Sequence, residues 1–307
     1  MIQIEQLSKR FAVQRTGTSA WRWPRAPKMW VQAVQDISLR AENGSITGLL
    51  GANGAGKTTT LRMLAGLMQP DSGRLLIDGH DVLRQRSAAL AQLGMLSDAR
   101  GLYPRLTARE NIVYFARLHG LSDAQAQARA DLLADLLDLR PLLGRATEGF
   151  SQGERVKTAL ARALVHDPAN IVLDEPTNGL DVQATRALRE TLRYLRSPAG
   201  GSKCIIFSSH IMQEVERLCD QVLVIAQGRI VASGSVPELL QSTGQPDFED
   251  AFVQLAFASA APLAMGGGRT QPAATQPGAL QPYTYVGSAD PGLVEPAVSR
   301  SGEAPCA

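Results

Sequence analysis

The stretch from residue 46 to residue 60 constrains the fold more than any other, because a glycine-rich turn there joins an apolar run to a helical pattern. It reads ITGLLGANGAGKTTT and contains the spacing G-x-x-x-x-G-K-T. The glycines of such a turn let backbone N–H groups crowd around a phosphate, Lys57 reaches the outer phosphate oxygens, and the Thr58 hydroxyl is a ligand for Mg²⁺. Apolar residues then recur at helical spacing as far as Met68. We therefore expect a strand, a phosphate-binding loop (P-loop) and a helix in direct succession.

Two further segments resemble buried strands, NIVLDEP at 170–176 and KCIIFSSH at 203–210. Apolar strands separated by helices indicate a parallel sheet that is covered on both faces. Near the end of the folded part, VLVIAQGRIVASG at 222–234 predicts a β-hairpin that turns at Gln227 and Gly228. The predicted fold class is α/β, with a P-loop NTPase core of mainly parallel sheet, an antiparallel β element and a helical insertion subdomain.

The helical insertion is expected where strand signals stop, between residues 98 and 148. Thr107 with Glu110, and Ser122 with Gln125, fit the capping box that opens a helix.

The C-terminal part is expected to contain one helix and then no folded structure. The helix DFEDAFVQLAF, at 247–257, has Phe248, Phe252 and Leu255 on one face. From Ser259 onward the chain is rich in Ala, Pro, Gly, Gln, Ser and Thr. Such a segment cannot bury enough apolar surface to offset its ordering entropy, so we expect a disordered tail over 259–307.

Composition excludes several classes of partner. The net charge is only +2, which gives no electrostatic reason to expect nucleic acid binding. Three scattered cysteines favour neither a disulfide framework nor a zinc site, and they fit a reducing cytosol. The sequence shows no signal-peptide pattern and no run of eighteen apolar residues. If the protein serves a membrane process, we expect it to act from outside the bilayer.

An acidic pair ends the strand-like run IVLDE. Asp174 stands where a carboxylate supports Mg²⁺ in P-loop enzymes, and Glu175 can polarise an attacking water. Taken alone, the pair could equally be a solvated strand end. A GTPase would need an Asn-Lys-x-Asp motif, and no Asn of this chain is followed by Lys.

The stretch FSQGERVKTALARALVHDP, at 150–168, opens a long helix with a Ser-x-Gly-Glu turn. A helix N-terminus of this kind is a natural phosphate site, although the P-loop already surrounds one nucleotide. The ordered set of motifs resembles the ATP-binding cassette (ABC) ATPases over about residues 2–258. In this resemblance GANGAGKT is the Walker A motif, FSQGE the signature, IVLDE the Walker B motif, NGLD (178–181) the D-loop and His210 the switch histidine.

The resemblance implies that two such domains pack head to tail, with each ATP between one subunit's P-loop and the other's signature helix. It implies a catalytic set of Glu175 as general base, His210 at the γ-phosphate, and Lys57. It implies three Mg²⁺ ligands, Thr58, Asp174 and Asp98. The nucleotide-contacting residues that it implies are Phe11 on the adenine, Gly51, Ala52, Asn53, Gly54, Ala55, Gly56, Lys57, Thr58 and Thr59 in the loop, Ser151, Gln152, Gly153 and Glu154 on the partner's ATP, and Asp181 between the two sites. From residues alone, Phe11 could equally belong to the core.

The domain boundaries follow from the same resemblance. Residues 1–245 form the ABC ATPase domain, with the helical subdomain at about 98–165, and residues 246–258 form a C-terminal helix.

Two departures from the family pattern point to one branch. Asp98 stands where the family carries a Gln, and the signature is SQGE rather than the commoner SGGQ. With the flanking GLYPRLTARENI and the terminal DFEDAFVQL, these variants are similar to a bacterial exporter branch (ABC-2 type) that includes sodium-extrusion subunits. The resemblance implies ATP and Mg²⁺ as cofactors, a second ATP-binding subunit, a separate transmembrane permease, and a peripheral position on the cytoplasmic face of the inner membrane. Sodium is one candidate cargo. The alternatives are a soluble ABC ATPase without a transporter and a degenerate cassette that binds ATP without turnover.

All three tryptophans lie in TSAWRWPRAPKMW at 18–30, interleaved with Arg22, Arg25 and Lys28. The segment is expected to be an exposed loop between the first two strands. A contact with lipid headgroups or with the membrane subunit is the alternative, because Trp and Arg are both favoured there.

Overall fold

The computed structural model describes residues 1–13, 29–97 and 101–258, all within one compact unit, Met1–Pro262. Asp98, most of the tryptophan-rich segment and the tail over 259–307 lie outside the described residues.

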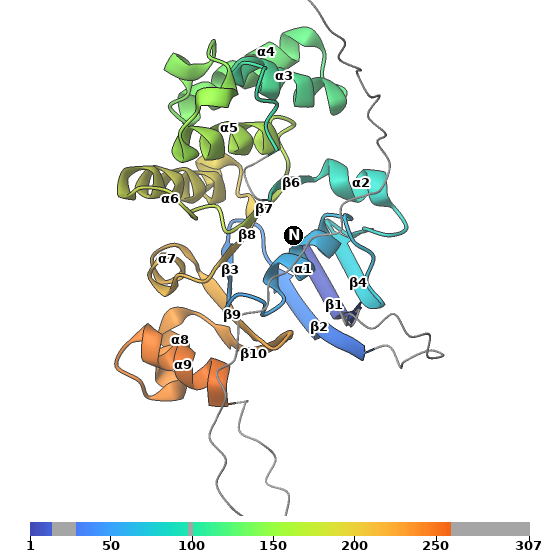
Figure 1. The fold of residues 1–307 in the computed structure, drawn as a ribbon, viewed down its shortest axis with the longest axis vertical. Helices are drawn as coiled ribbons and strands as arrows, with labels where there is room; N and C mark the ends of the chain where they lie inside the picture. Colours follow the sequence, from blue (N-terminus) through green and yellow to red (C-terminus); the bar gives the residue numbers. More distant parts are fainter. Residues whose placement is uncertain (14–28, 98–100, 259–307) are drawn as a thin grey trace, which may run out of the picture. The chain divides into compact units, whose positions relative to one another are not determined.

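A six-stranded sheet carries the P-loop (Figure 1). Its strand order is β10-β9-β3-β8-β7-β6, and every neighbouring pair is parallel except β9 with β10. The strands are β3 (Ile46–Leu50), β6 (Leu93–Leu96), β7 (Asn170–Asp174), β8 (Cys204–Ser209), β9 (Gln221–Ala226) and β10 (Arg229–Gly234). Residues of β3 and β8 are buried throughout, as expected for apolar strands with covered faces. The mainly parallel sheet and the hairpin at Gln227 and Gly228 are confirmed.

A second, antiparallel sheet has the order β2-β1-β4-β5. Its strands are β1 (Ile2–Val13), β2 (Met29–Ala41), β4 (Ser72–Ile77) and β5 (His80–Asp81). In β1, buried Ile2 and Ile4 are followed by buried Leu7, three positions on instead of two. The register shifts there and Gln6 has a φ of 49°, so a bulge restores the inward direction of the apolar side chains.

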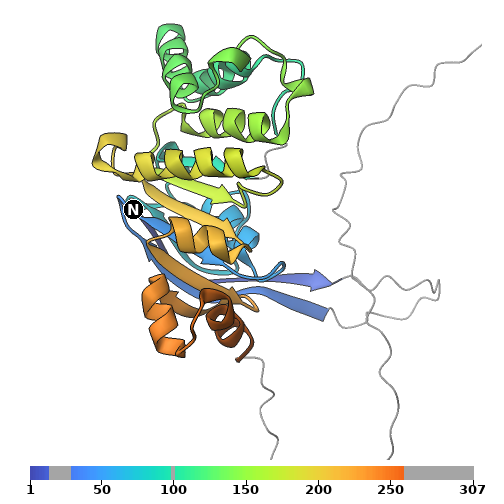
Figure 2. The ribbon, with the colours of Figure 1, turned by 90° about the vertical axis from the view of Figure 1, so that its left-hand side faces the viewer.

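The outer part of β1 and β2 extends as a two-stranded ribbon, shown in blue in Figure 2. Met29 and Trp30 belong to this ribbon, which corrects the expectation that all of residues 18–30 form a loop. Trp30 is half-exposed, and the Arg10 guanidinium lies 4.9 Å from the centre of its ring. This cation–π contact joins the two strands of the ribbon.

The helices fall into two groups. Those that flank the sheets are α1 (Lys57–Leu64), α2 (Arg86–Ala91), α6 (Val182–Arg196), α7 (Met212–Leu218), α8 (Val236–Thr243) and α9 (Phe248–Ala258), with the short η3 (Pro198–Gly200). Those of the helical insertion are α3 (Ala108–Leu118), α4 (Asp123–Leu136) and α5 (Gln152–Leu164), with η1 (Arg140–Leu142) and η2 (Thr147–Gly149). Figure 1 shows the second group gathered beside β6 and β7.

The predicted capping boxes at Thr107 and Ser122 are both present. The helix after the P-loop is shorter than its apolar spacing indicated, because it ends at Leu64 and leaves Met68 outside. Gly66, with a φ of 66°, donates its N–H to the Met63 carbonyl, and the next N–H reaches back to residue 62. These bonds form a Schellman motif, which ends the helix despite the continuing apolar pattern.

The predicted C-terminal helix is confirmed as α9. Phe248 and Phe252 are buried and Leu255 packs against the same core, so one face of α9 closes the fold as expected.

Candidate nucleotide site

The P-loop follows β3 and depends on close backbone packing at its two framing glycines. A Cβ on Gly51 would lie 2.3 Å from the Ile225 carbonyl oxygen, and a Cβ on Gly56 would lie 2.5 Å from that of Ala33. Gly56 also has a φ of 108°, a region that side chains with a Cβ rarely adopt. Glycine is therefore required at these two positions by close backbone packing, in addition to the predicted binding of phosphate.

The turn between β9 and β10 holds the P-loop from behind. Gly228 donates its N–H to the Ala55 carbonyl at 2.9 Å, and its own carbonyl accepts from the Gln35 N–H at 2.7 Å. A Cβ on Gly228 would lie 2.8 Å from the Ala33 carbonyl oxygen. The sequence marked this glycine only as a hairpin turn, so its contact with the loop is a finding of the structure.

Lys57 is the first residue of α1 and is 4% exposed. Its Nζ donates to the Gly51 carbonyl at 2.7 Å and to the Ala52 carbonyl at 3.2 Å. The carboxylate of Glu175 lies 3.5 Å away. The ammonium is thus positioned inside the loop, as a group that neutralises phosphate oxygens must be.

Thr58 and Asp174 meet at the carboxyl end of the parallel sheet. The Thr58 hydroxyl donates to Asp174 Oδ1 at 3.2 Å, and the Ser208 hydroxyl donates to the same oxygen at 2.7 Å. Ser208 is fully buried on β8 and was missed by the sequence analysis. Only the pairing of Asp174 with Ser208 across β7 and β8 explains its position, and such pairing leaves no local pattern in a sequence.

Glu175 follows directly and turns out of the strand with a φ of 47°. Its backbone N–H donates to Ser208, to the carbonyl at 3.2 Å and to the hydroxyl at 3.0 Å. His210 Nδ1 lies 3.2 Å from Glu175 Oε2, at ion-pair distance but without hydrogen-bond geometry. The carboxylate therefore lies between Lys57 on one side and the imidazole on the other.

The loop and Glu175 enclose a cavity of about 120 Å³. It is lined by Ala33, Asn53, Gly54, Ala55, Gly56, Lys57, Thr58, Thr59 and Glu175. A larger cleft of about 780 Å³ adjoins it, since Thr58 and Glu175 line both. Asp174 and Gln152 also line this cleft. The structure thus brings most of the expected loop residues together with both acidic residues.

The signature turn has the geometry of a helix cap. Ser151 is the N-cap of α5, and its N–H donates to Glu154 Oε2 at 2.7 Å. This bond, with a smaller contribution from Arg145, holds the pKa of the Glu154 carboxyl below its usual value. Ser151 and Gln152 are exposed to solvent. Of the four signature residues, only Gln152 lines the cleft that contains Thr58.

Two expected nucleotide contacts lie away from the cavity. Asp181 is the N-cap of α6 and accepts from the Ala184 N–H at 2.8 Å. Phe11 lies on β1 opposite Val31 and is 40% exposed, which excludes the core interpretation. Its ring faces solvent and has the Lys9 ammonium 5.8 Å from its centre.

The donor set at Thr58 and Asp174 fits Mg²⁺. A hydroxyl and a carboxylate oxygen, 3.2 Å apart, are the hard oxygen ligands that this ion prefers, and it retains waters in its other positions. Among the described residues, no group of three His, Cys, Asp or Glu side chains could hold a metal by itself. The two donors would therefore share the ion with phosphate oxygens.

A P-loop at the carboxyl end of a parallel sheet, beside an acidic strand end, defines a P-loop nucleoside triphosphatase. Residues 34–178 match the model of the ABC transporter family. The chain is 43% identical to the ABC transporter ATP-binding protein NatA of Bacillus subtilis over 227 residues, covering 74% of this chain and 91% of that one. It is 40% identical to the Nod factor export ATP-binding protein I of Paraburkholderia xenovorans, covering 68% of each.

Solved structures have the same fold. An ATP-binding subunit of an ABC transporter superposes with a TM-score of 0.68 at 26% identity, covering 83% of this chain and 98% of that one. A post-hydrolysis dimer of an ATP-binding cassette, bound to ADP and Pi, gives 0.66 at 20% identity, covering 76% and 98%. The chain belongs to the ABC transporter family, as one of its ATP-binding proteins, and is an ATPase. Within the described ranges, no helix is long and apolar enough to cross a bilayer.

Proposed function

We propose that the chain hydrolyses ATP at the cavity between its P-loop and Glu175, and that it does so as one subunit of a dimer that drives a separate membrane subunit. The observation that carries the chemistry is the position of Glu175. Its carboxylate lies 3.5 Å from Lys57 Nζ and 3.2 Å from His210 Nδ1, at the mouth of the glycine-rich loop. A carboxylate held there accepts a proton from a water that attacks the terminal phosphate.

The other residues have binding and orienting roles in this proposal. The backbone N–H groups of 51–59 surround the phosphates, and Lys57 neutralises the outer oxygens. His210 contacts the γ-phosphate and orients the water. Phe11, exposed at the edge of β1, offers a flat face for the adenine.

Mg²⁺ is proposed to bind at Thr58 and Asp174, with Asp98, which lies outside the described residues, as a further expected ligand. The ion would neutralise the charge that develops on the phosphate oxygens. Ser208 holds the Asp174 carboxylate in place at 2.7 Å, which keeps one oxygen directed toward Thr58.

The second subunit is proposed to complete the site through its signature turn. The N-terminus of α5 is exposed, and its free N–H groups and dipole favour phosphate. Ser151, Gln152, Gly153 and Glu154 would face the partner's ATP, and Asp181 would link the two sites. Support comes from the structural neighbour described as a dimer bound to ADP and Pi.

The membrane subunit is proposed to dock on an aromatic surface of the helical insertion, formed by Tyr103, Tyr114 and Leu118. These side chains are 46%, 41% and 63% exposed, and the two tyrosine rings pack edge to face at 5.5 Å. Exposed aromatic side chains that already support one another lose little entropy on binding, which makes them favourable anchors for a partner helix. Docking there would hold the protein at the cytoplasmic face of the inner membrane.

The cargo is proposed at a coarser level, as a molecule that leaves the cell. Sodium stays a prediction from the variant signature and the terminal helix. One relative is named for the export of Nod factors, so relatives of this chain serve more than one cargo.

Replacing the proposed base tests the function directly. Glu175→Gln should lower ATP turnover by at least about a hundredfold, because it removes a general base. It should also trap an ATP-bound dimer, measured by light scattering with and without ATP. Glu249→Gln, at an exposed position of α9, is the matched control and should behave as wild type. A Glu175→Gln protein that remains monomeric with ATP and keeps normal turnover would contradict the proposal.

A further inference from the structure

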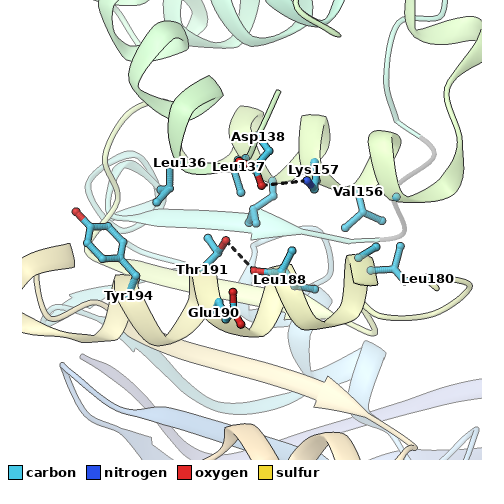
Figure 3. Close-up of a pocket in the computed structure, with 14 residues that line it drawn as sticks. Leu136, Leu137, Asp138, Val156, Lys157, Leu180, Leu188, Glu190, Thr191 and Tyr194 are labelled. Atoms are coloured by element: carbon cyan, nitrogen blue, oxygen red, sulfur yellow. Dashed lines mark hydrogen bonds and ion pairs between the residues drawn. The ribbon is translucent and has the colours of Figure 1, made fainter. Parts of the chain in front are cut away.

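Helices α5 and α6 face each other across a groove, shown in Figure 3. The groove has a volume of about 200 Å³, and Val156 of α5 and Leu188 of α6 point into it. At its side Asp138 and Lys157 form an ion pair at 3.7 Å. The two helices therefore leave a groove between them, although Val156 and Leu188 at its lining are buried in the common core.

The two helices come close at their N-terminal ends. A Cβ on Gly153 would lie 3.4 Å from the Ala184 Cβ, and a Cβ on Gly179 would lie 3.5 Å from Gln152 Cγ. An added Cβ at either glycine would thus be at van der Waals distance from its neighbour. The signature turn therefore lies directly beside the turn that leads into α6 of the same subunit.

That turn is continuous with the proposed catalytic carboxylate. Asn178 donates its N–H to the Glu175 carbonyl at 3.2 Å, and Leu180 donates to the Thr177 carbonyl at 3.0 Å. Gly179, between them, has a φ of 75°. Gly179 is therefore connected to Glu175 by only one turn of hydrogen-bonded backbone.

We infer that Gln152 is a positioning residue that couples the signature turn to Glu175 of its own subunit. The inference rests on the proposed function, in which Ser151 and its neighbours engage the partner's ATP. That engagement would move the N-terminus of α5, and the Gln152 side chain would carry the movement to Gly179. Each ATP would then influence hydrolysis at the other site.

The glutamine itself is what makes this contact possible. Glycine, which the commoner signature has at this position, offers no side chain to reach Gly179. Gln152 Cγ lies 3.5 Å from where a Cβ on Gly179 would be, so the side chain runs beside Gly179. Gln152, Gly179 and Val156, one helical turn after Gln152, line the same cleft, and the amide lies beyond Cγ. The amide donates and accepts, so it can bond to backbone groups of the turn as well as pack on it.

Two variants separate this coupling from a general loss of function. Gln152→Ala removes the contact while keeping a good helix former, and Gln152→Met keeps the length but removes the amide. In the full chain, ATP turnover is measured against ATP concentration. Two coupled sites give a Hill coefficient between 1 and about 2. We expect a value above 1 for the wild type, about 1 for Gln152→Ala and an intermediate value for Gln152→Met.

The same variants should leave nucleotide affinity of the monomer within about twofold of wild type, because Gln152 does not line the P-loop cavity of its own subunit. ATP-dependent dimerisation in the Glu175→Gln background is measured in parallel. Gln127→Ala, at an exposed helical glutamine of α4, is the control and should retain the wild-type Hill coefficient.

The outcomes distinguish the inference from the function on which it rests. If both Gln152 variants dimerise and keep the wild-type Hill coefficient, the coupling is refuted and the proposed function stands. If the wild type neither dimerises nor shows a Hill coefficient above 1, the shared-site function fails and the coupling fails with it.

Discussion

At the scale of single residues, three glycines shape the nucleotide site through carbonyl groups that are remote in sequence. Gly51 packs on residue 225, while Gly56 and Gly228 both pack on Ala33. Each approach is closer than a Cβ allows. The phosphate-binding conformation is therefore fixed by neighbouring backbone as much as by the loop's own residues.

Gly228→Ala should weaken ATP binding although residue 228 does not line the cavity. The new Cβ would lie 2.8 Å from the Ala33 carbonyl oxygen, at a position with a φ of 77°. Positive φ costs alanine about 1–2 kcal/mol, and overpacking costs a further ~1–3 kcal/mol. Equilibrium ATP binding and thermal unfolding measure both effects.

Gly79→Ala separates backbone strain from the clash. Gly79 has nearly the same φ, 80°, and nothing lies within 4 Å of a Cβ placed there. It should lose stability through strain alone and keep normal ATP affinity. Equal losses of affinity in the two variants would show that the carbonyl contact has no role in the site.

The residues that the sequence predicted and those that it missed differ in a physical way. Lys57, Thr58, Asp174 and Glu175 lie in local motifs, where spacing along the chain determines position. Ser208 and the contact of Gly228 with the loop depend on pairing between strands far apart in sequence. Local patterns do not encode such pairing, so neither could be predicted.

At the scale of elements, one contact joins the end of α3 to the end of α5. The rings of His119 and His166 stack in parallel, 3.7 Å apart, and His166 Nε2 lies 3.2 Å from the Leu93 carbonyl oxygen. Burial, and then the neighbouring His119, lower the pKa of His166 to about 4. Arg129 acts in the same direction, while Asp167 and the Leu93 carbonyl oppose it.

This pair should make the fold sensitive to acid. In the unfolded chain the pKa of a histidine is about 6.5, which is above the pKa of His166 in the folded protein. At pH values between these two pKa values, the unfolded state therefore binds more protons than the folded state. The contribution of His166 to stability is complete above about pH 6.5 and is lost progressively as the pH falls toward 4. Urea unfolding at several pH values in this range measures the loss.

His166→Gln removes the titrating group and keeps a donor for the Leu93 carbonyl. Its free energy of unfolding should fall less steeply with acid than that of the wild type. Parallel curves for the two proteins would assign the acid sensitivity to other groups.

Elements were predicted better than their ends. The capping boxes of α3 and α4 and the hairpin turn carry their own side-chain or glycine signals. The predicted end of α1 was wrong, because the turn at Gly66 ends the helix although four apolar residues continue the helical spacing. Residues 29 and 30 were expected in a loop but belong to β2, where the Arg10 guanidinium lies over the Trp30 ring.

At the scale of the whole molecule, the nucleotide site and the proposed docking surface lie on different parts of the fold. The first is formed by the ends of β3, β7 and β8, and the second by the helical insertion. A change on the aromatic surface should therefore separate recruitment from catalysis.

Leu118→Asp should reduce recovery of the protein with membranes that contain the partner subunit. We expect the affinity to fall by about tenfold or more, because an apolar anchor contributes ~1.4 kcal/mol or more to binding. ATP turnover of the isolated protein should be unchanged. Leu132→Asp, at an exposed leucine of α4, is the matched control. Co-sedimentation measures the difference, and equal recovery of both variants would place the partner elsewhere.

The strand order has a consequence for how the protein is made. The P-loop strand β3 pairs with β8 on one side and β9 on the other, and β9 ends only at Ala226. During translation the loop leaves the ribosome long before the strands that support it, by on the order of ten seconds or more at roughly 5–20 residues per second. A nascent chain whose P-loop has already left the ribosome is thus unable to bind nucleotide. Premature stops between the P-loop and the hairpin should yield chains that hydrolyse no ATP but expose at least one unpaired edge of β3 to chaperones and proteases.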